Sequence, residues 1–276
     1  MPRQKKTKLN ESEERKQFLE IIKDKSAGSQ RQYLSQYDNL FTSFNTDLTE
    51  LDYDTIVNYL NENFENPNTK KNYVNIFILL QKEDAGLKND LVKYRETLRE
   101  KTDTKLKEKN AELNLVLPPY EDLMDAVKKY VGKQYIINYL LTTLYVRNKD
   151  LNVLVSSKDA DINIQEGNHL ILSNNKVEYI RNEYKTVRKY GQLIRVITDK
   201  KFIKFIRDFL ENKKTKELLE TKQIDHEIRK YTYQSLSESD YLKVILKHFT
   251  NPLNVNKLFE IQNSRGTDIS VILKNY

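Results

Sequence analysis

The chain has 276 residues, 32% of them charged and 38% hydrophobic, with a formal charge of +7 and a pI of about 9.1. It has no cysteine, which excludes disulfides, thiolate catalysis and cysteine-ligated metals. Its three histidines are well separated, so we expect neither a metal site nor a cofactor. No apolar stretch is long enough to span a membrane, and no signal-peptide core begins the chain, so we expect an intracellular protein without a membrane segment.

The basic balance favours an anionic partner, most often nucleic acid, although a lysine-rich composition from an AT-rich genome gives the same balance. Residues 1–12, which include Lys5 and Lys6, predict a disordered basic arm that contacts DNA. Residues 13–112 predict a small helical domain, because apolar and aromatic residues recur at helical spacing. The expected core includes Phe18, Ile22, Tyr37, Leu40, Ile56, Leu60, Tyr73, Ile76, Phe77, Leu91 and Leu98.

Residues 113–119 end in Pro118-Pro119 and predict a stiff linker, since prolines stop helices. Residues 120–276 predict a second domain, in which helices surround a small antiparallel sheet. HLILS, Asn174-Asn175 and KVEYI read as a hairpin, and YKTVRKY and LIRVI extend it. Further on, Thr198-Asp199 is expected to cap a helix with an apolar face that includes Phe202 and Ile206, and Ser237 with Asp240 is expected to cap another. The chain is therefore predicted to be mainly α with a small antiparallel β-sheet, an α+β fold of two domains.

The stretch YLLTTLYVRNKD ends an apolar run in one arginine, Arg147, which we expect at the end of a buried helix. Placing an arginine there is costly unless it has a partner. Two interpretations remain open at this point: an internal carboxylate pairs with Arg147, or Arg147 faces an external anion.

The stretch LLTTLYVRNKDL, residues 140–151, resembles the first arginine motif of the tyrosine recombinases, the phage-type integrases. The order of predicted elements is similar to that family over nearly the whole chain. The resemblance implies that Arg147 grips the scissile phosphate and that Asp150 is the acidic residue of the motif. A guanidinium suits this role because its planar fork matches two phosphate oxygens and it keeps its proton.

The stretch EYKTVRKYG, residues 183–191, is similar to the lysine-bearing hairpin of the same family. The resemblance implies that Lys185, on a strand, is the general acid for the leaving 5′ oxygen, and that Arg188 and Lys189 contact the DNA backbone. The alternative is an exposed basic hairpin that only improves solubility.

The second arginine motif of the family, His-x-x-Arg, has no clear match. Leu246-Lys247-His248 resembles it in its local letters and puts Lys247 in the place of the arginine. Lys243 fits the distance to the C-terminus slightly better. His226 and Arg229 have the right letters but lie too far upstream. A solvated lysine face on this helix remains the plain alternative.

The C-terminal stretch resembles the last family motif, with Gly266-Thr267 in the place of Gly-His or Gly-Trp and Tyr276 as the nucleophile. The resemblance implies a 3′-phosphotyrosyl intermediate formed without a metal. The alternative is a loose terminal tyrosine, since a frayed chain end holds a nucleophile poorly.

Two functions follow from these motifs: a DNA-cleaving and rejoining recombinase of a viral or mobile element, or a degenerate recombinase fold that only binds DNA. A helical interaction protein with incidental charge is the third possibility. The expected partner is double-stranded DNA, and the resemblance implies a homo-tetramer assembled on it.

Overall fold

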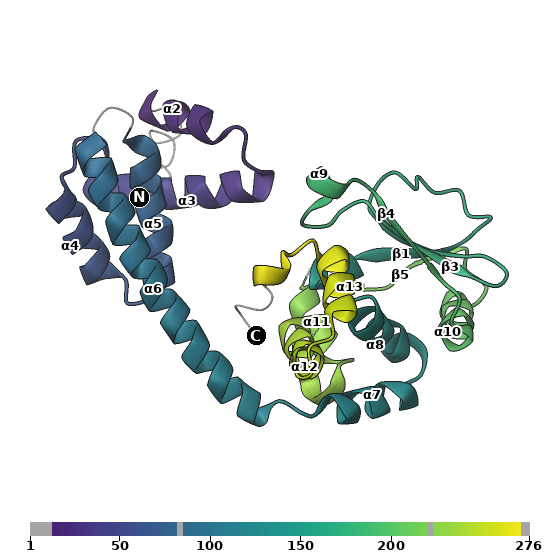
Figure 1. The fold of residues 1–276 in the computed structure, drawn as a ribbon. Coiled ribbons are helices and arrows are strands. Elements are labelled where there is room, and N and C mark those ends of the chain that lie inside the picture. The colour runs from purple at the N-terminus through teal and green to yellow at the C-terminus, as the bar shows by residue number, and fades with distance from the viewer. Residues whose placement is uncertain (1–12, 82–84, 220–222, 272–276) are drawn as a thin grey trace. The chain divides into compact units, whose positions relative to one another are not determined.

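The computed structural model describes residues 13–81, 85–219 and 223–271. The chain divides into two compact units, residues 1–109 and 110–276 (Figure 1). Each unit is described by itself below. Within the described residues, no helix combines the length and the apolar character that a membrane crossing requires.

The N-terminal unit is helical. Its elements are α2 (Glu13–Ile22), α3 (Ala27–Phe44), α4 (Tyr53–Asn63), α5 (Pro67–Leu80) and the first part of α6 (Ala85–Val116). Side chains cap three of the helix starts: Ser26 accepts from the backbone of Ser29, Asp52 from Thr55, and Asn66 from Asn68. The expected core residues are buried and form one apolar cluster.

Helix α6 is longer than the sequence indicated. It passes residue 112, where the predicted helical domain ends, and takes up the first part of the stretch 113–119 that the sequence assigned to a linker. The helix ends before Pro118-Pro119, which cannot continue it. The division into a domain of residues 13–112 and one of residues 120–276 stays a prediction.

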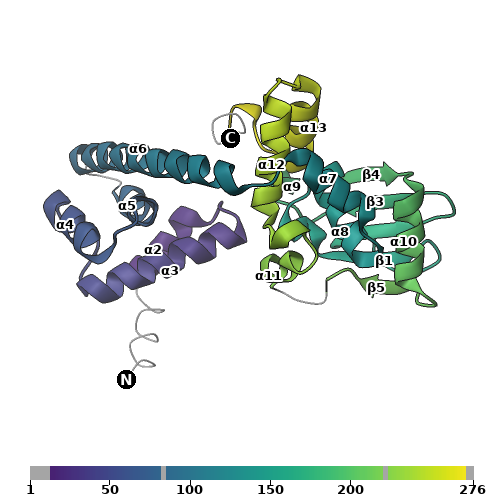
Figure 2. The same cartoon turned by 90° about the horizontal axis from the view of Figure 1, so that it is seen from below.

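The C-terminal unit packs helices on a five-stranded sheet with strand order β4-β3-β2-β1-β5 (Figures 1 and 2). The strands are β1 (Val153–Ser157), β2 (Asn168–Leu172), β3 (Val177–Arg181), β4 (Leu193–Ile197) and β5 (Thr215–Glu217). The helices are α7 (Tyr120–Lys129), α8 (Gly132–Thr143), η1 (Asn148–Leu151), α9 (Val187–Tyr190), α10 (Lys200–Leu210), α11 (Ile224–Arg229), η2 (Tyr233–Ser235), α12 (Glu238–Thr250) and α13 (Val255–Arg265).

One main apolar core joins α8 and α10 to the sheet, around Ile136, Leu140, Val155, Leu170 and Phe202. A smaller cluster lies between α12 and α13 and includes Tyr145. The predicted starts of two helices are confirmed. Asp199 caps α10, and Ser237 with Asp240 forms a capping box at the start of α12.

The α+β fold class is confirmed, but the sheet is mixed rather than antiparallel. The predicted hairpin is present, with β2 antiparallel to β3, and β4 pairs antiparallel with β3. Strand β1 instead pairs parallel with β2, and β5 adds an antiparallel edge. The parallel pair depends on the connection over residues 158–167, whose course the local pattern did not reveal.

The stretch Tyr184–Tyr190 is not a strand. Its backbone closes turns, with Val187 N donating to Tyr184 O and Lys189 N to Thr186 O, and its second half is the short helix α9. Lys185 therefore lies in the connection between β3 and β4, rather than on a strand as predicted.

Candidate functional site

Arg147 is presented by an irregular segment and not by a helix end. Helix α8 stops at Thr143, and Tyr145 takes a left-handed conformation with φ of 53°. Arg147 is the N-cap residue of η1, and its backbone N–H donates to Asp150 Oδ2 at 3.1 Å. The turn at Tyr145 re-aims the chain just before Arg147.

The Arg147 guanidinium lacks an ion pair among the described residues. Its Nη2 donates to Thr267 Oγ1 at 2.7 Å, while its Nη1 is buried and has no hydrogen-bond partner there. A buried donor without an acceptor is costly, and the cost is higher for a charged group. The Arg147 side chain therefore has a hydrogen-bond donor, Nη1, that is free among the described residues and that an external acceptor could bind.

Asp150, the carboxylate nearest to Arg147 in sequence, pairs with another arginine through Oδ2, while its Oδ1 is buried without a hydrogen-bond partner among the described residues. Asp150 Oδ2 accepts from Arg181 Nη1 at 3.1 Å, and both side chains are almost fully buried. Arg181 also donates to Ser264 O at 2.9 Å, and the Tyr179 hydroxyl donates to Asp150 O at 2.6 Å. The internal ion pair of this site is thus Arg181 with Asp150.

A third arginine, Arg265, lies in the last turn of α13. Its Nη1 is 2.6 Å from Glu238 Oε1, in the first turn of α12, and donates to Tyr145 O at 3.2 Å and Val146 O at 3.3 Å. These carbonyls directly precede Arg147, so Arg265 helps to hold the segment that presents it.

The cluster of Arg147, Arg181 and Arg265 with Asp150 and Glu238 has one more positive than negative group. Burial lowers the pKa of the Arg147 guanidinium, the charges of Arg265 and Arg181 lower it further, and the two carboxylates oppose them. An anion arriving at Arg147 would relieve both the desolvation and the like-charge repulsion.

The connection between β3 and β4 reaches this cluster through Gly266. This residue is the C-cap of α13 with φ of 57°, and a side-chain carbon there would overlap Thr186. Lys185 precedes Thr186 and is exposed. The pKa of Asp268 is lowered mainly by hydrogen bonds from Ser270, and Lys189 adds to this, so the loop lies beside the residues that follow α13.

Arg188 and Lys189 are exposed on α9, in the same connection. The structure therefore places Arg147 and Thr267 in direct contact, with the loop carrying Lys185, Arg188 and Lys189 against Gly266.

Lys247 is not brought to this cluster. It lies in the last turn of α12, where its Nζ donates to Asn114 O at 3.1 Å. At 1.5 Å per residue, the helix separates it from Glu238 by about 14 Å. The resemblance of Leu246-Lys247-His248 to the second arginine motif was misleading. Lys247 and His248 lie in the last turn of α12, whereas the first turn of α12 lies beside Arg265.

Of the remaining candidates for the second arginine motif, Lys243 lies within α12. His226 and Arg229 are exposed on α11, and their contacts in the described part of the chain do not include Arg147. Helix α11 does pack against η1, where Asn148 donates to Asp225, but Arg229 donates to Ser235 O at 3.1 Å. Lys5, Lys6 and Tyr276 lie outside the described residues.

Sequence reasoning missed Arg181 and Arg265. Arg181 directly follows the predicted strand KVEYI and is the last residue of β3, and a charged residue at the end of an apolar strand was the available signal. Arg265 precedes Gly266-Thr267, which did draw attention, but nothing local distinguishes it from an exposed arginine at a helix end.

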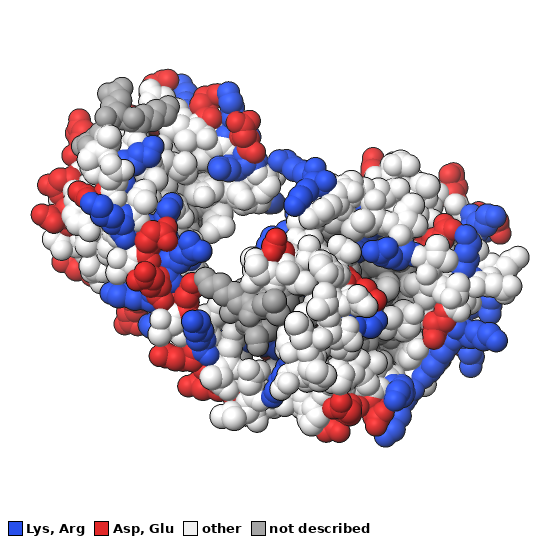
Figure 3. All heavy atoms as spheres, in the orientation of Figure 1, with Lys and Arg blue, Asp and Glu red and all other residues white. Residues whose placement is uncertain are grey.

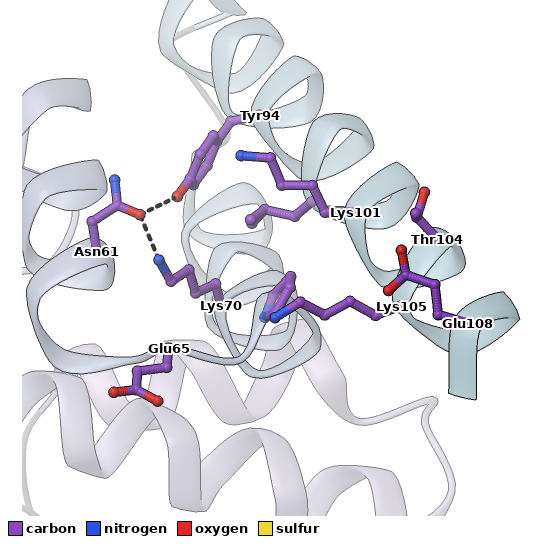
Figure 4. A pocket seen from close by; sticks show the side chains of 10 residues that line it. Asn61, Glu65, Lys70, Tyr94, Lys101, Thr104, Lys105 and Glu108 are labelled. Carbon is purple, nitrogen blue, oxygen red and sulfur yellow. Dashed lines mark hydrogen bonds between the residues drawn. The ribbon is translucent and has the colours of Figure 1, made fainter. Parts of the chain in front are cut away.

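A second feature with basic side chains lies in the N-terminal unit. A hollow of about 530 Å³ is lined by Asn61, Tyr94, Lys70, Lys101 and Lys105, among others. Asn61 Oδ1 accepts from Lys70 Nζ at 2.7 Å and from the Tyr94 hydroxyl at 3.1 Å. Figure 4 shows Lys101 and Lys105 extending from α6 over the hollow, which Glu65 and Glu108 also line, so three lysines lie beside two carboxylates there.

Further cations follow α10, whose apolar side is buried in the core. Lys200, Lys204 and Arg207 are exposed on it, and Figure 3 shows lysine and arginine gathered over this part of the C-terminal unit. In the described ranges, no group of three or more His, Cys, Asp or Glu residues is arranged to hold a metal ion.

Comparison with known proteins gives little beyond this geometry. No protein-family model matches the chain, and neither does any curated protein. Among solved structures, the XerA recombinase is similar at 15% identity and a TM-score of 0.32, covering 96% of this chain and 93% of that chain. At these values the similarity assigns no role to any residue of this chain. The site is therefore described from the contacts within this chain alone.

Proposed function

We propose that the chain binds double-stranded DNA and that Arg147 grips a backbone phosphate. The proposal is supported most by the guanidinium of Arg147, which among the described residues has a buried Nη1 without an acceptor and no ion pair, while Asp150 pairs with Arg181 through Oδ2. A phosphate supplies two acceptor oxygens and a negative charge, which are what this group lacks. The motif resemblance of residues 140–151 to tyrosine recombinases supports the same choice of ligand.

We further propose that the reaction, if the chain is active, is strand cleavage and rejoining. The Tyr276 hydroxyl releases its proton to solvent as its oxygen attacks the phosphorus, and the phosphorus–O5′ bond breaks. Lys185 gives a proton to the leaving oxygen and regains one from solvent afterwards. The reverse steps, with an attacking 5′ hydroxyl, restore the phosphodiester and free the tyrosine. Arg147 stabilises the charge that develops on the phosphate.

The N-terminal unit is proposed to act as a clamp domain, with residues 113–119 as the link. Its support is the hollow that three lysines (Lys70, Lys101, Lys105) and two glutamates (Glu65, Glu108) line, because a depression with an excess of ammonium groups suits backbone phosphates. The exposed Arg188 and Lys189, together with Lys5 and Lys6, are proposed as further phosphate contacts, and a tetramer on DNA is the proposed assembly.

The binding proposal is tested with a duplex of arbitrary sequence at about 50 mM salt, where phosphate-driven binding is strong. Arg147→Ala is expected to weaken binding about tenfold or more, since a hydrogen bond to a charged group contributes roughly 1.5–3 kcal/mol. Arg207→Ala on α10 removes the same charge away from the site and is the matched control. Equal affinity for Arg147→Ala and wild type would refute the proposal.

Cleavage is tested with nicked substrates taken from the DNA bordering the coding sequence. An active enzyme accumulates a covalent protein–DNA adduct, and Tyr276→Phe removes the adduct while DNA binding persists. Binding without any adduct would instead favour the second candidate, a DNA-binding protein that has lost cleavage. The observation that favours this candidate is Glu238, a carboxylate within the arginine cluster.

A further inference from the structure

We propose that Arg265, delivered from α13, is a second phosphate-binding guanidinium of the Arg147 site, and that Glu238 restrains it. This rests on the proposed phosphate at Arg147. It assigns the second cation to a residue outside the helix in which the sequence sought it, and it gives Glu238 the role of an internal counter-charge.

The first observation in favour of this proposal is the position of Arg265 beside the segment that presents Arg147. Its Nη1 donates to the carbonyls of Tyr145 and Val146, the two residues before Arg147. An anion bound by Arg147 would therefore lie within reach of the neighbouring guanidinium. The two positive charges also act on each other, since Arg265 is the largest charge that lowers the pKa of Arg147.

The second observation is that only one of the three guanidinium nitrogens of Arg265 is engaged in the described contacts. The described contacts engage Nη1 alone, through two carbonyls and Glu238, and provide no partner for Nε and Nη2. Its side chain is 10% exposed, so it is anchored at one nitrogen without being sealed from solvent. A guanidinium held in this way keeps a second edge for a phosphate oxygen.

The third observation concerns Glu238. Its carboxylate is 2.6 Å from Arg265 Nη1 and belongs to the first turn of α12, where backbone N–H groups and the helix dipole attract negative charge. A phosphate entering the site meets this carboxylate as a competitor for Arg265 and as a repelling charge. Glu238 therefore lowers the affinity of the site for DNA.

The test measures duplex affinity at several salt concentrations. Glu238→Gln is expected to bind about threefold tighter or more, because it removes a nearby negative charge. Glu178→Gln is the matched control: it makes the same change in net charge near the start of β3, where Glu178 pairs with Lys176 at 2.5 Å. Affinity of Glu238→Gln no higher than that of this control would overturn the restraining role.

The double variant Glu238→Gln/Arg265→Gln separates binding from support. It removes both charges of the pair and can keep a hydrogen bond between the two amides. If Arg265 only supports the fold, the double variant binds DNA like wild type; if Arg265 holds phosphate, binding stays about tenfold weaker. Thermal unfolding confirms that each variant is folded. If the double variant unfolds, the comparison of Glu238→Gln with Glu178→Gln decides the proposal.

The failure of this inference differs from the failure of the proposed function. Unchanged binding by Arg147→Ala defeats both. Loss of binding by Arg147→Ala, together with wild-type binding by the Glu238 and double variants, defeats only the role of Arg265 and Glu238.

Discussion

The end of strand β3 and the start of η1 each bring an arginine to Asp150, and the two are used in opposite ways. Arg181 is almost fully buried, pairs with the Asp150 carboxylate and donates to Ser264 O. Arg147 meets the same carboxylate only through its backbone N–H and leaves a guanidinium nitrogen without an acceptor. The difference teaches that proximity to a carboxylate does not decide whether an arginine is structural, because the carboxylate can be taken by another group.

The largest expected effect is on stability and follows from removing Arg181, the arginine that pairs with Asp150. Arg181→Ala leaves Asp150 buried without its partner, and we expect a loss of about 3–5 kcal/mol in the free energy of unfolding. Denaturant unfolding measures it. Arg147→Ala is the matched control and should cost far less, since it removes no ion pair. Similar losses for the two variants would end the distinction between them.

The next effect concerns the contact that joins α13 to the loop of Lys185. Gly266→Ala places a side chain in a left-handed position and against Thr186, and we expect a loss of about 1–2 kcal/mol from the strain alone. Gly28→Ala, where nothing lies within 4 Å of the added carbon, should be neutral or mildly stabilising. Thermal unfolding of the two variants provides the comparison.

A third prediction sharpens the functional side. Lys185→Ala should abolish adduct formation, or weaken DNA binding a few-fold if no adduct forms, because Lys185 lies next to the Thr186–Gly266 contact. Lys247→Ala, which removes a lysine bound to Asn114 O, should leave both unchanged. A stronger effect of Lys247→Ala than of Lys185→Ala would restore the placement indicated by the sequence.

The smallest expected effect is at Thr267. Thr267→Val removes the acceptor of Arg147 Nη2 and keeps the side-chain shape, so Arg147 loses orientation but not charge. DNA affinity should fall about two- to fivefold, less than for Arg147→Ala, at the roughly 1 kcal/mol of a neutral hydrogen bond. Thr267→Ser retains the hydroxyl and should bind like wild type. Equal binding by the valine variant would show that Thr267 does not orient Arg147.

Local patterns predicted many elements because their causes are local. The Ser237–Asp240 capping box, the Asp199 cap and the Asn174-Asn175 turn each act within a few residues, and all are present. The apolar spacing likewise predicted the buried face of α10. The strand predicted at Tyr184–Tyr190 failed because its alternation of basic and apolar residues also fits a turn and a short helix.

The sequence by itself determined the α+β fold class, the capped starts of α10 and α12, and the choice of Arg147 as the residue to explain. Only the tertiary structure decided what Arg147 contacts. The pairing of Asp150 with Arg181, the bond from Arg147 to Thr267 and the hold of Arg265 on Tyr145 join residues far apart in the chain. Such contacts depend on how α13, β3 and η1 pack together. A short stretch of sequence therefore does not determine which of several nearby arginines pairs with a buried carboxylate.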